Sequence, residues 1–200
     1  MTYTFGIEIE TSGASISAIK SALEAAEIRG CDVKPDGTPG VDAEIVLPPL
    51  APCDFAFGYI KSICRALDRV GADVNSKCGL HVHIGNAPLN DSTHAVRFCG
   101  DSIQARARTG RYITGAYAEP MDFVAVQDIM FRYTRQQSTI NTMFPRSRTD
   151  NRYCAPLSVA RIERATTIRD LTFGKFTAIN LETWGRGTIE FRQASGTIEA

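Results

Sequence analysis

The sequence has little of several features that would assign a function class at once. Its 22 basic and 22 acidic residues give no net charge, so no overall attraction to nucleic acid or to an acidic membrane surface is expected. No apolar run approaches the roughly 20 residues that span a bilayer. The six cysteines form no CxxC pair and no zinc-type spacing, and no signal peptide precedes them. We therefore expect a cytoplasmic protein with six reduced, mostly buried thiols.

Lysine is missing from residues 97–169, whereas this segment holds twelve arginines. A planar guanidinium binds phosphate and carboxylate groups with two parallel hydrogen bonds, so an arginine-rich segment suits the recognition of such anions. The alternative is a solvated helical surface, and the sequence leaves both interpretations open.

The periodicity of apolar residues predicts strands and helices within one domain covering residues 1–200. Strand patterns occur at residues 3–11, 43–49, 79–85, 176–183 and 188–193. Helical patterns occur at residues 15–29, 55–70, 91–109, 120–142 and 158–171, and turn-forming residues predict loops at 34–40 and 144–157. The closing hairpin requires an antiparallel pair, so the fold class is α+β or α/β.

Four of these strands carry polar side chains at alternating positions, which places them on one face of each strand. On a single strand this pattern is typical of the solvated side of a sheet. The residues are Glu8 and Glu10 on the first strand, Glu44 (with Asp42 two residues before it), His81 and His83, and Glu190 with Arg192.

If the four polar faces share one surface, the carboxylates crowd each other. Like charges about 4 Å apart cost roughly 4 kcal/mol at an effective dielectric near 20. Such a cluster is explained by bound cations or by carboxyl groups whose pKa is raised for proton transfer. Glutamates with one or two histidines suit Mg²⁺ or Mn²⁺ better than structural zinc. Arg192 beside them indicates an anion as well, such as a phosphate chain bridged by the metals.

Six short motifs occur in the order found in the amidoligase family, and the chain resembles that family from residue 5 to residue 198. They are FGIEIE, DAEIVLPPL, CGLHVHIG, PRSRTDNRYC, FTAINLET and GTIEFRQASGT. The family is part of the superfamily of glutamine synthetase and glutamate–cysteine ligase. The resemblance implies an ATP-dependent ligase that joins a carboxylate to an amine as a peptide or isopeptide-like amide. It further implies an acyl-phosphate intermediate, release of ADP and phosphate, and two Mg²⁺ or Mn²⁺ ions.

The resemblance also implies roles for individual residues. The metal ligands would be Glu8, Glu10, Glu44, His81 and Glu190, and the catalytic residues Arg192, Glu190 and Glu8, with Arg192 stabilising the transferred γ-phosphate. The nucleotide contacts would be His83, Arg192, Lys175, Arg148 and Asn180. Arg146, Asn151 and Tyr153 are further candidates for nucleotide or substrate contact. For Lys175 and Arg146 a solvated surface role is the alternative.

The fold implied by the resemblance is a curved, mostly antiparallel sheet, like the catalytic domain of glutamine synthetase. The active site would lie on its concave face, with helices packed behind. Family members continue beyond the GT motif, whereas this chain stops at Ala200. A second copy of the chain or another partner would then cover the sheet at this end. The substrates would be small-molecule or peptide carboxylates and amines, which the sequence does not identify.

Three other functions stay open at this point. A metal-dependent hydrolase of amides or phosphoesters would use the same carboxylates and histidines without ATP. A non-catalytic nucleotide-binding module would keep the fold alone, although unpaired buried charges then have a stability cost. A kinase acting on a guanidino group would transfer phosphate without condensation.

Overall fold

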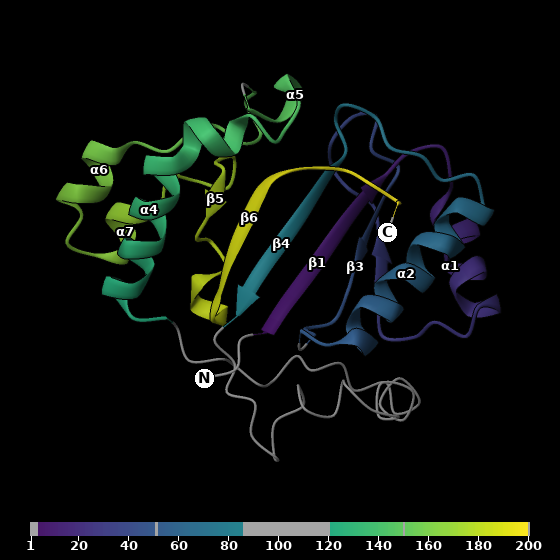
Figure 1. Cartoon of the computed structure of the whole chain (residues 1–200). Coiled ribbons are helices and arrows are strands. Elements are labelled where there is room, and N and C mark those ends of the chain that lie inside the picture. Colours follow the sequence, from purple (N-terminus) through teal and green to yellow (C-terminus); the bar gives the residue numbers. More distant parts are fainter. Residues whose placement is uncertain (1–3, 51, 86–120, 150, 200) are drawn as a thin grey trace, which may run out of the picture.

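The computed structural model describes residues 4–50, 52–85, 121–149 and 151–199, and its centre is a six-stranded sheet (Figure 1). Its strand order is β2-β3-β1-β4-β6-β5, and every neighbouring pair is antiparallel. An antiparallel sheet with separate helices confirms the α+β class, whereas its likeness to glutamine synthetase stays a prediction. The strands are β1 (Thr4–Thr11), β2 (Asp32–Lys34), β3 (Ala43–Val46), β4 (Gly79–Gly85), β5 (Ile179–Asn180) and β6 (Thr188–Ser195).

Two helices cover the β2-β3-β1 side of the sheet: α1 (Ile16–Ala25) and α2 (Asp54–Arg69). The Ser15 hydroxyl caps α1 by accepting a hydrogen bond from the Ala18 amide. Ile9 and Ile45 from the sheet pack with Ile63 from α2 in one apolar core. All three are almost fully buried, and each such side chain contributes roughly 1.5–3 kcal/mol to stability.

A second core lies beside β5 and β6, beneath α4 (Phe123–Asn141), α6 (Val159–Arg164) and α7 (Ile168–Leu171). Ile84, which packs against this core, lies opposite Ile189 in the register, and Leu80 on the same face of β4 lies opposite Ile9 of the first core. Because residues opposite each other share a face, both cores lie on one face of the sheet. The other face is left for the polar side chains.

Most of the predicted elements are confirmed by the structure. The strand predicted at 79–85 matches β4, and those at 3–11, 43–49 and 188–193 match β1, β3 and β6 closely. The helices predicted at 55–70 and 120–142 match α2 and α4, and the helix at 15–29 is present but ends at Ala25. The helix predicted at 91–109 lies outside the described residues. The sequence pattern does not predict strand β2, because it is only three residues long.

Two predicted elements are wrong in extent. The helix predicted at 158–171 is two short helices, because Ala165 leaves the helical conformation and Thr167 starts α7 with a capping box to Asp170. The strand predicted at 176–183 forms only Ile179–Asn180, and a 3-10 turn, η2 (Trp184–Arg186), then leads through Gly187 in the left-handed conformation to β6. The loop predicted at 144–157 contains a single helical turn, α5 (Arg146–Thr149).

One prediction about the cysteines also fails. Cys53 is disulfide-bonded, whereas Cys31, Cys64, Cys78 and Cys154 are free thiols. Spacing along the chain does not reveal which thiols meet in space, so the sequence could not indicate this bond. None of the helices in the described part of the chain has the length and apolar character that crossing a membrane requires.

Candidate functional site

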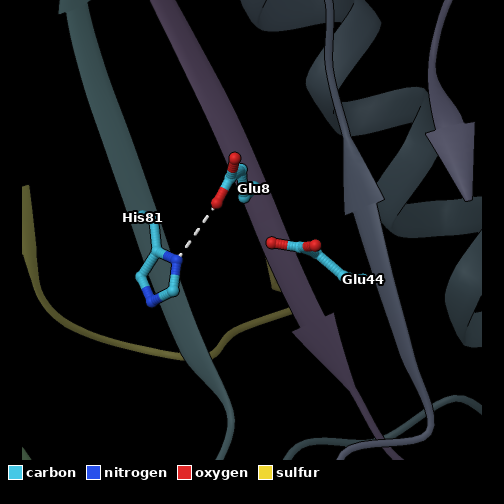
Figure 2. Close-up of side chains that lie close together, drawn as sticks. All are labelled: Glu8, Glu44 and His81. Carbon is cyan, nitrogen blue, oxygen red and sulfur yellow. Dashed lines mark hydrogen bonds and ion pairs between the residues drawn. The ribbon is translucent and has the colours of Figure 1, made fainter. Parts of the chain in front are cut away.

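The polar side chains of β1, β3, β4 and β6 lie on the sheet face opposite the two cores. In the register Glu10 lies opposite Glu44, Glu8 opposite His81, and His83 opposite Glu190. Strand alternation thus brings together all five residues that were predicted as metal ligands. Figure 2 shows Glu8 of β1 between His81 of β4 and Glu44 of β3, with all three side chains directed toward one another.

His81 is the centre of this group and is almost fully buried. Its Nδ1 lies 3.2 Å from Glu8 Oε2 and 3.4 Å from Glu190 Oε1, and its Nε2 lies 3.5 Å from Glu10 Oε1. One imidazole ring therefore contacts carboxylates from two strands, β1 and β6. Glu10 is held further by the Gly79 amide, which donates to its Oε2 at 2.7 Å.

Glu190 is fixed from three sides. The Asn180 side-chain amide of β5 donates to Glu190 Oε2 at 2.6 Å, while Arg192 and His81 contact Oε1. The Asn180 oxygen accepts from the Glu182 amide, so both of its polar atoms are in use. Asn180 is thus placed to orient Glu190, and the nucleotide contact predicted for it stays untested. His83 Nε2 lies 3.2 Å from Glu8 Oε1 but makes no hydrogen bond of good geometry.

The proximity of the carboxylates shifts their pKa values in different directions. Burial raises the pKa of Glu44 to about 7, with the Lys34 ammonium opposing this shift and the Glu8 charge adding to it. Burial likewise raises the pKa of Glu10. The charge of His81 and the hydrogen bond from the Gly79 amide oppose this shift without cancelling it. Burial would also raise the pKa of Glu8, but the hydrogen bond with His81 and the nearby His83 imidazole outweigh it and hold that pKa below its ordinary value. Neighbouring carboxyl groups with opposite shifts are typical of functional sites.

The donor atoms fit hard divalent cations. Three overlapping groups each offer ligand atoms within 4.8 Å of one another: Glu8, Glu44 and His81; Glu8, His83 and Glu190; Glu10, Asp36 and Glu44. The first two groups combine carboxylate oxygens with an imidazole nitrogen, and the third has carboxylate oxygens alone. These donors suit Mg²⁺ or Mn²⁺. Glu8 belongs to two groups, and so does Glu44. The residues present are therefore compatible with more than one bound ion.

A cleft of about 600 Å³ lies over this face, and both carboxylates and positively charged side chains line it. On one side it is lined by Glu8, Glu10, Asp36 and Glu44, which we call the acidic side. On the other it is lined by Arg148, Arg152, Lys175 and Arg192, which we call the basic side. The volume lies in the range of small-molecule sites.

Irregular backbone positions the basic side. Arg192 and Gln193 together oppose the single residue His81, because the register between β4 and β6 shifts at this point. The Arg192 carbonyl accepts a hydrogen bond from Arg148 Nη2 at 2.5 Å. Arg148 is buried, although its Nε has no hydrogen-bond partner among the residues that the structure describes. The two arginines that were predicted as nucleotide contacts, Arg148 and Arg192, are thereby joined.

Several predicted residues lie elsewhere or act locally. Arg146 is exposed and lies outside the cleft, as expected for a solvated side chain. Asn151 accepts hydrogen bonds from the amides of Tyr153 and Cys154, so it shapes the turn that presents Tyr153 to the cleft. The Asp42 carboxylate accepts a hydrogen bond from the Gly13 amide at 2.8 Å and does not line the cleft.

Four charged or aromatic residues of the cleft and one neighbour had no assigned role from the sequence. Asp36 lies in the loop 35–40, and the Lys77 ammonium donates a hydrogen bond to the Pro39 carbonyl of that loop. Lys34 forms an ion pair with Glu44 at 2.8 Å. Arg152 and Phe176 flank Tyr153 and Lys175 on the opposite rim. Arg152 and Phe176 adjoin predicted site residues in the sequence, and Lys34 and Asp36 belong to the turn-rich segment 34–40, whereas Lys77 carries neither signal.

The chain matches the model of a known protein family. The model of a family described as "Putative amidoligase enzyme" matches residues 30–200. No curated protein matches the chain. The matched range includes Glu44, His81, His83, Glu190 and Arg192, whereas Glu8 and Glu10 precede it. The sheet register and the contacts with His81 place these two glutamates in the site.

Proposed function

The chain belongs to the amidoligase family, and we propose that it is an ATP-dependent ligase that joins a carboxylate to an amine as an amide. The observation that carries this proposal is the shared cleft. Carboxylates and histidine that can hold divalent cations face arginine and lysine side chains that can hold a polyphosphate. Positively charged side chains next to a metal cluster are explained when an anion binds between them.

The residues that would hold Mg²⁺ or Mn²⁺ are Glu8, Glu10, Glu44, His81 and Glu190. When bound, the two ions would neutralise the charge of the triphosphate and orient its γ-phosphate. His83 lies at the edge of this set, where its buried Nε2 faces Glu8 Oε1 at 3.2 Å, and it does not line the cleft. Lys175 and Arg148 line the same cleft and supply further positive charge toward the nucleotide.

In the first chemical step, an oxygen of the substrate carboxylate attacks the γ-phosphorus, the bond to the β-phosphate oxygen breaks, and ADP leaves. Arg192 stabilises the charge of the phosphoryl group in transit, and its pairing with Glu190 fixes its orientation. In the second step, the amine attacks the acyl carbon and phosphate leaves, while the amine nitrogen loses a proton. Acidic side chains next to the arriving amine are placed to accept that proton.

Release of ADP provides the test. Purified protein with ATP and Mg²⁺ should release ADP only when both a suitable carboxylate and a suitable amine are supplied from a substrate panel. Glu190→Gln should abolish this release. Its melting temperature should change by no more than about 4 °C, the shift that about 1 kcal/mol produces in a chain of this size. Glu163→Gln, on an exposed face of α6, is the matched control and should keep full activity.

Two outcomes would contradict the proposal. Full activity of Glu190→Gln would remove the assigned role of that residue. Hydrolysis of an amide or phosphoester by the metal-loaded protein without nucleotide would favour the hydrolase instead, because that reaction needs the same metal ligands and no ATP.

A further inference from the structure

Two aromatic rings form part of the rim of the cleft on its basic side. Tyr153 and Phe176 meet edge to face, with ring centroids 5.7 Å apart, and both line the cleft. Phe176 keeps 45% of its surface exposed, although it is a large apolar side chain. An exposed aromatic ring at the mouth of a binding cleft has a cost in solvation, and such surfaces commonly mark a contact site.

The backbone beneath these rings is fixed. Residues 155 and 177 form a parallel bridge, in which the Ala155 amide donates to the Phe176 carbonyl and the Ala178 amide donates to the Ala155 carbonyl, both at 2.9 Å. The Asn151 side chain holds the Tyr153 amide at 2.6 Å. The two rings are therefore presented by segments joined to each other, which gives a preformed surface rather than two independent loops.

Each ring carries a positive charge from the residue that precedes it in the sequence. The Arg152 guanidinium lies 4.9 Å from the centroid of Tyr153, and the Lys175 ammonium lies 4.9 Å from that of Phe176. Arg148 and Arg192 lie deeper in the same cleft. A ligand that fits this surface has a planar ring system and negative charge, whereas a cationic ligand would be repelled by four neighbouring cations.

We propose that Tyr153 and Phe176 form the nucleoside subsite of the cleft, where the base of a nucleotide stacks on Phe176. The phosphate chain then extends past Lys175 toward Arg148, Arg192 and the carboxylate cluster. Stacking contributes about 1–3 kcal/mol per base in other proteins and tolerates different bases, since every base has a π face. This inference rests on the proposed function, because it assigns one end of the nucleotide that the ligase would use.

Comparison of two probes separates the base from the phosphates. Titration calorimetry would measure the binding of Mg·ATP and of Mg·tripolyphosphate, which lacks the nucleoside, to the wild type and to Phe176→Ala. The variant should bind Mg·ATP about 5- to 150-fold more weakly, the loss that corresponds to removal of one stacked base. Its affinity for Mg·tripolyphosphate should not change. Phe176→Tyr keeps an aromatic face and should restore binding of Mg·ATP.

The chain offers a matched control in Phe57→Ala, since Phe57 of α2 is also an exposed ring (59%) and lies outside the cleft. It should bind both probes as the wild type does. Equal affinities of the wild type and Phe176→Ala for Mg·ATP would overturn the subsite while leaving the ligase proposal intact. An equal loss for both probes would also overturn it, since Phe176 would then act on the phosphates. A wild type that binds neither probe would overturn both proposals.

Discussion

The acidic and basic sides of the cleft are built in different ways. Three of the four acidic residues, Glu8, Glu10 and Glu44, project from regular strands, and each lies opposite a partner in an unbroken register. The fourth, Asp36, lies in the loop between β2 and β3. Arg148 and Arg152, in contrast, come from the irregular chain between α4 and α6, Lys175 from the loop before β5, and Arg192 from the register shift in β6. β4 lies between the two sides and contributes both histidines.

This difference indicates different demands on the two sides. Metal ligands must converge within a few tenths of an ångström, which rigid strands achieve. Long guanidinium and ammonium side chains can reach an anion from loops, and loops tolerate changes in sequence and length. We infer that the acidic side fixes the chemistry, whereas the basic side is where recognition of the ligand can be altered.

The largest effect is expected at Gly79, where the two sides meet. A Cβ there would lie 2.7 Å from Arg148 Nη2 and 2.9 Å from His81 Nε2. Gly79→Ala must therefore displace Arg148, whose flexible end can move, or tilt the His81 ring. We expect at least about a 100-fold loss of ADP release, since misplacement by about 1 Å has effects of this size.

Gly58→Ala is the control for this change. Gly58 lies within α2 with open space around it, so alanine there should raise stability by up to about 1 kcal/mol and leave activity unchanged. Normal activity of Gly79→Ala would show that the close approach of the two sides has no functional importance.

A second prediction separates the sides by what each binds. Glu8→Gln should weaken Mn²⁺ binding without nucleotide by at least about 10-fold, because Glu8 offers an oxygen to two of the possible metal groups. Lys175→Met should leave Mn²⁺ affinity unchanged and weaken the binding of tripolyphosphate instead. Electron paramagnetic resonance of free Mn²⁺ measures the first affinity, and calorimetry measures the second. If both variants lost Mn²⁺ binding equally, the division into two sides would be wrong.

A smaller effect concerns the stability of the metal-free acidic side. Burial and the neighbouring Glu8 charge raise the pKa of Glu44 from 4.5 to about 7. The native state therefore holds this proton more tightly than the unfolded chain, and the free energy of unfolding should fall as pH rises from about 4.5 to 7. In EDTA, Glu44→Gln should flatten this fall and melt at a higher temperature than the wild type at pH 8.

The exposed carboxylate of α1 gives the matched variant, Glu24→Gln, which should leave the pH profile unchanged. Thermal unfolding between pH 4.5 and 8 measures both. A profile of Glu44→Gln identical to that of the wild type would mean that the carboxylates do not repel one another. Addition of Mg²⁺ to the wild type should also raise its melting temperature, since a ligand that binds only the native state stabilises it.

The smallest effect is expected behind the basic side, where α7 depends on its cap. Hydrogen bonds from Thr166 and Thr167 hold the pKa of Asp170 below its ordinary value of 3.8. Its charge therefore stabilises the fold above that pH, and the contribution is lost as the pH falls through the lowered pKa. Asp170→Asn should lower the melting temperature slightly at pH 7 but not near pH 2. A pH-independent difference would contradict this origin.

The acidic side could be predicted well from the sequence, for a physical reason. Alternation fixes which side chains share a strand face, so Glu8, Glu10, Glu44, His81 and Glu190 could be grouped from their positions along the chain. The distances between these side chains depend on the order of the strands and on their antiparallel register. Strand order and register follow from packing of the two cores rather than from the local sequence pattern.

The basic side could be predicted only in part. Arg148 and Arg192 were candidates through motifs, but their contact depends on a register shift that no periodicity reveals. Phe176, and on the acidic side Asp36, were missed because residues in loops carry no period from which an orientation follows. The single helix expected at 158–171 failed similarly, since the cap of Thr167 outweighed helical periodicity.

The central claim is that the two sides bind one metal–nucleotide complex together. The most direct measurement is calorimetric titration of ATP into the purified protein in Mg²⁺ and again in EDTA. We predict that each chain binds one ATP in Mg²⁺. In EDTA the affinity for ATP should be at least about 10-fold weaker, because the uncompensated carboxylates then repel the triphosphate. Equal affinity under both conditions, or no binding in Mg²⁺, would contradict it.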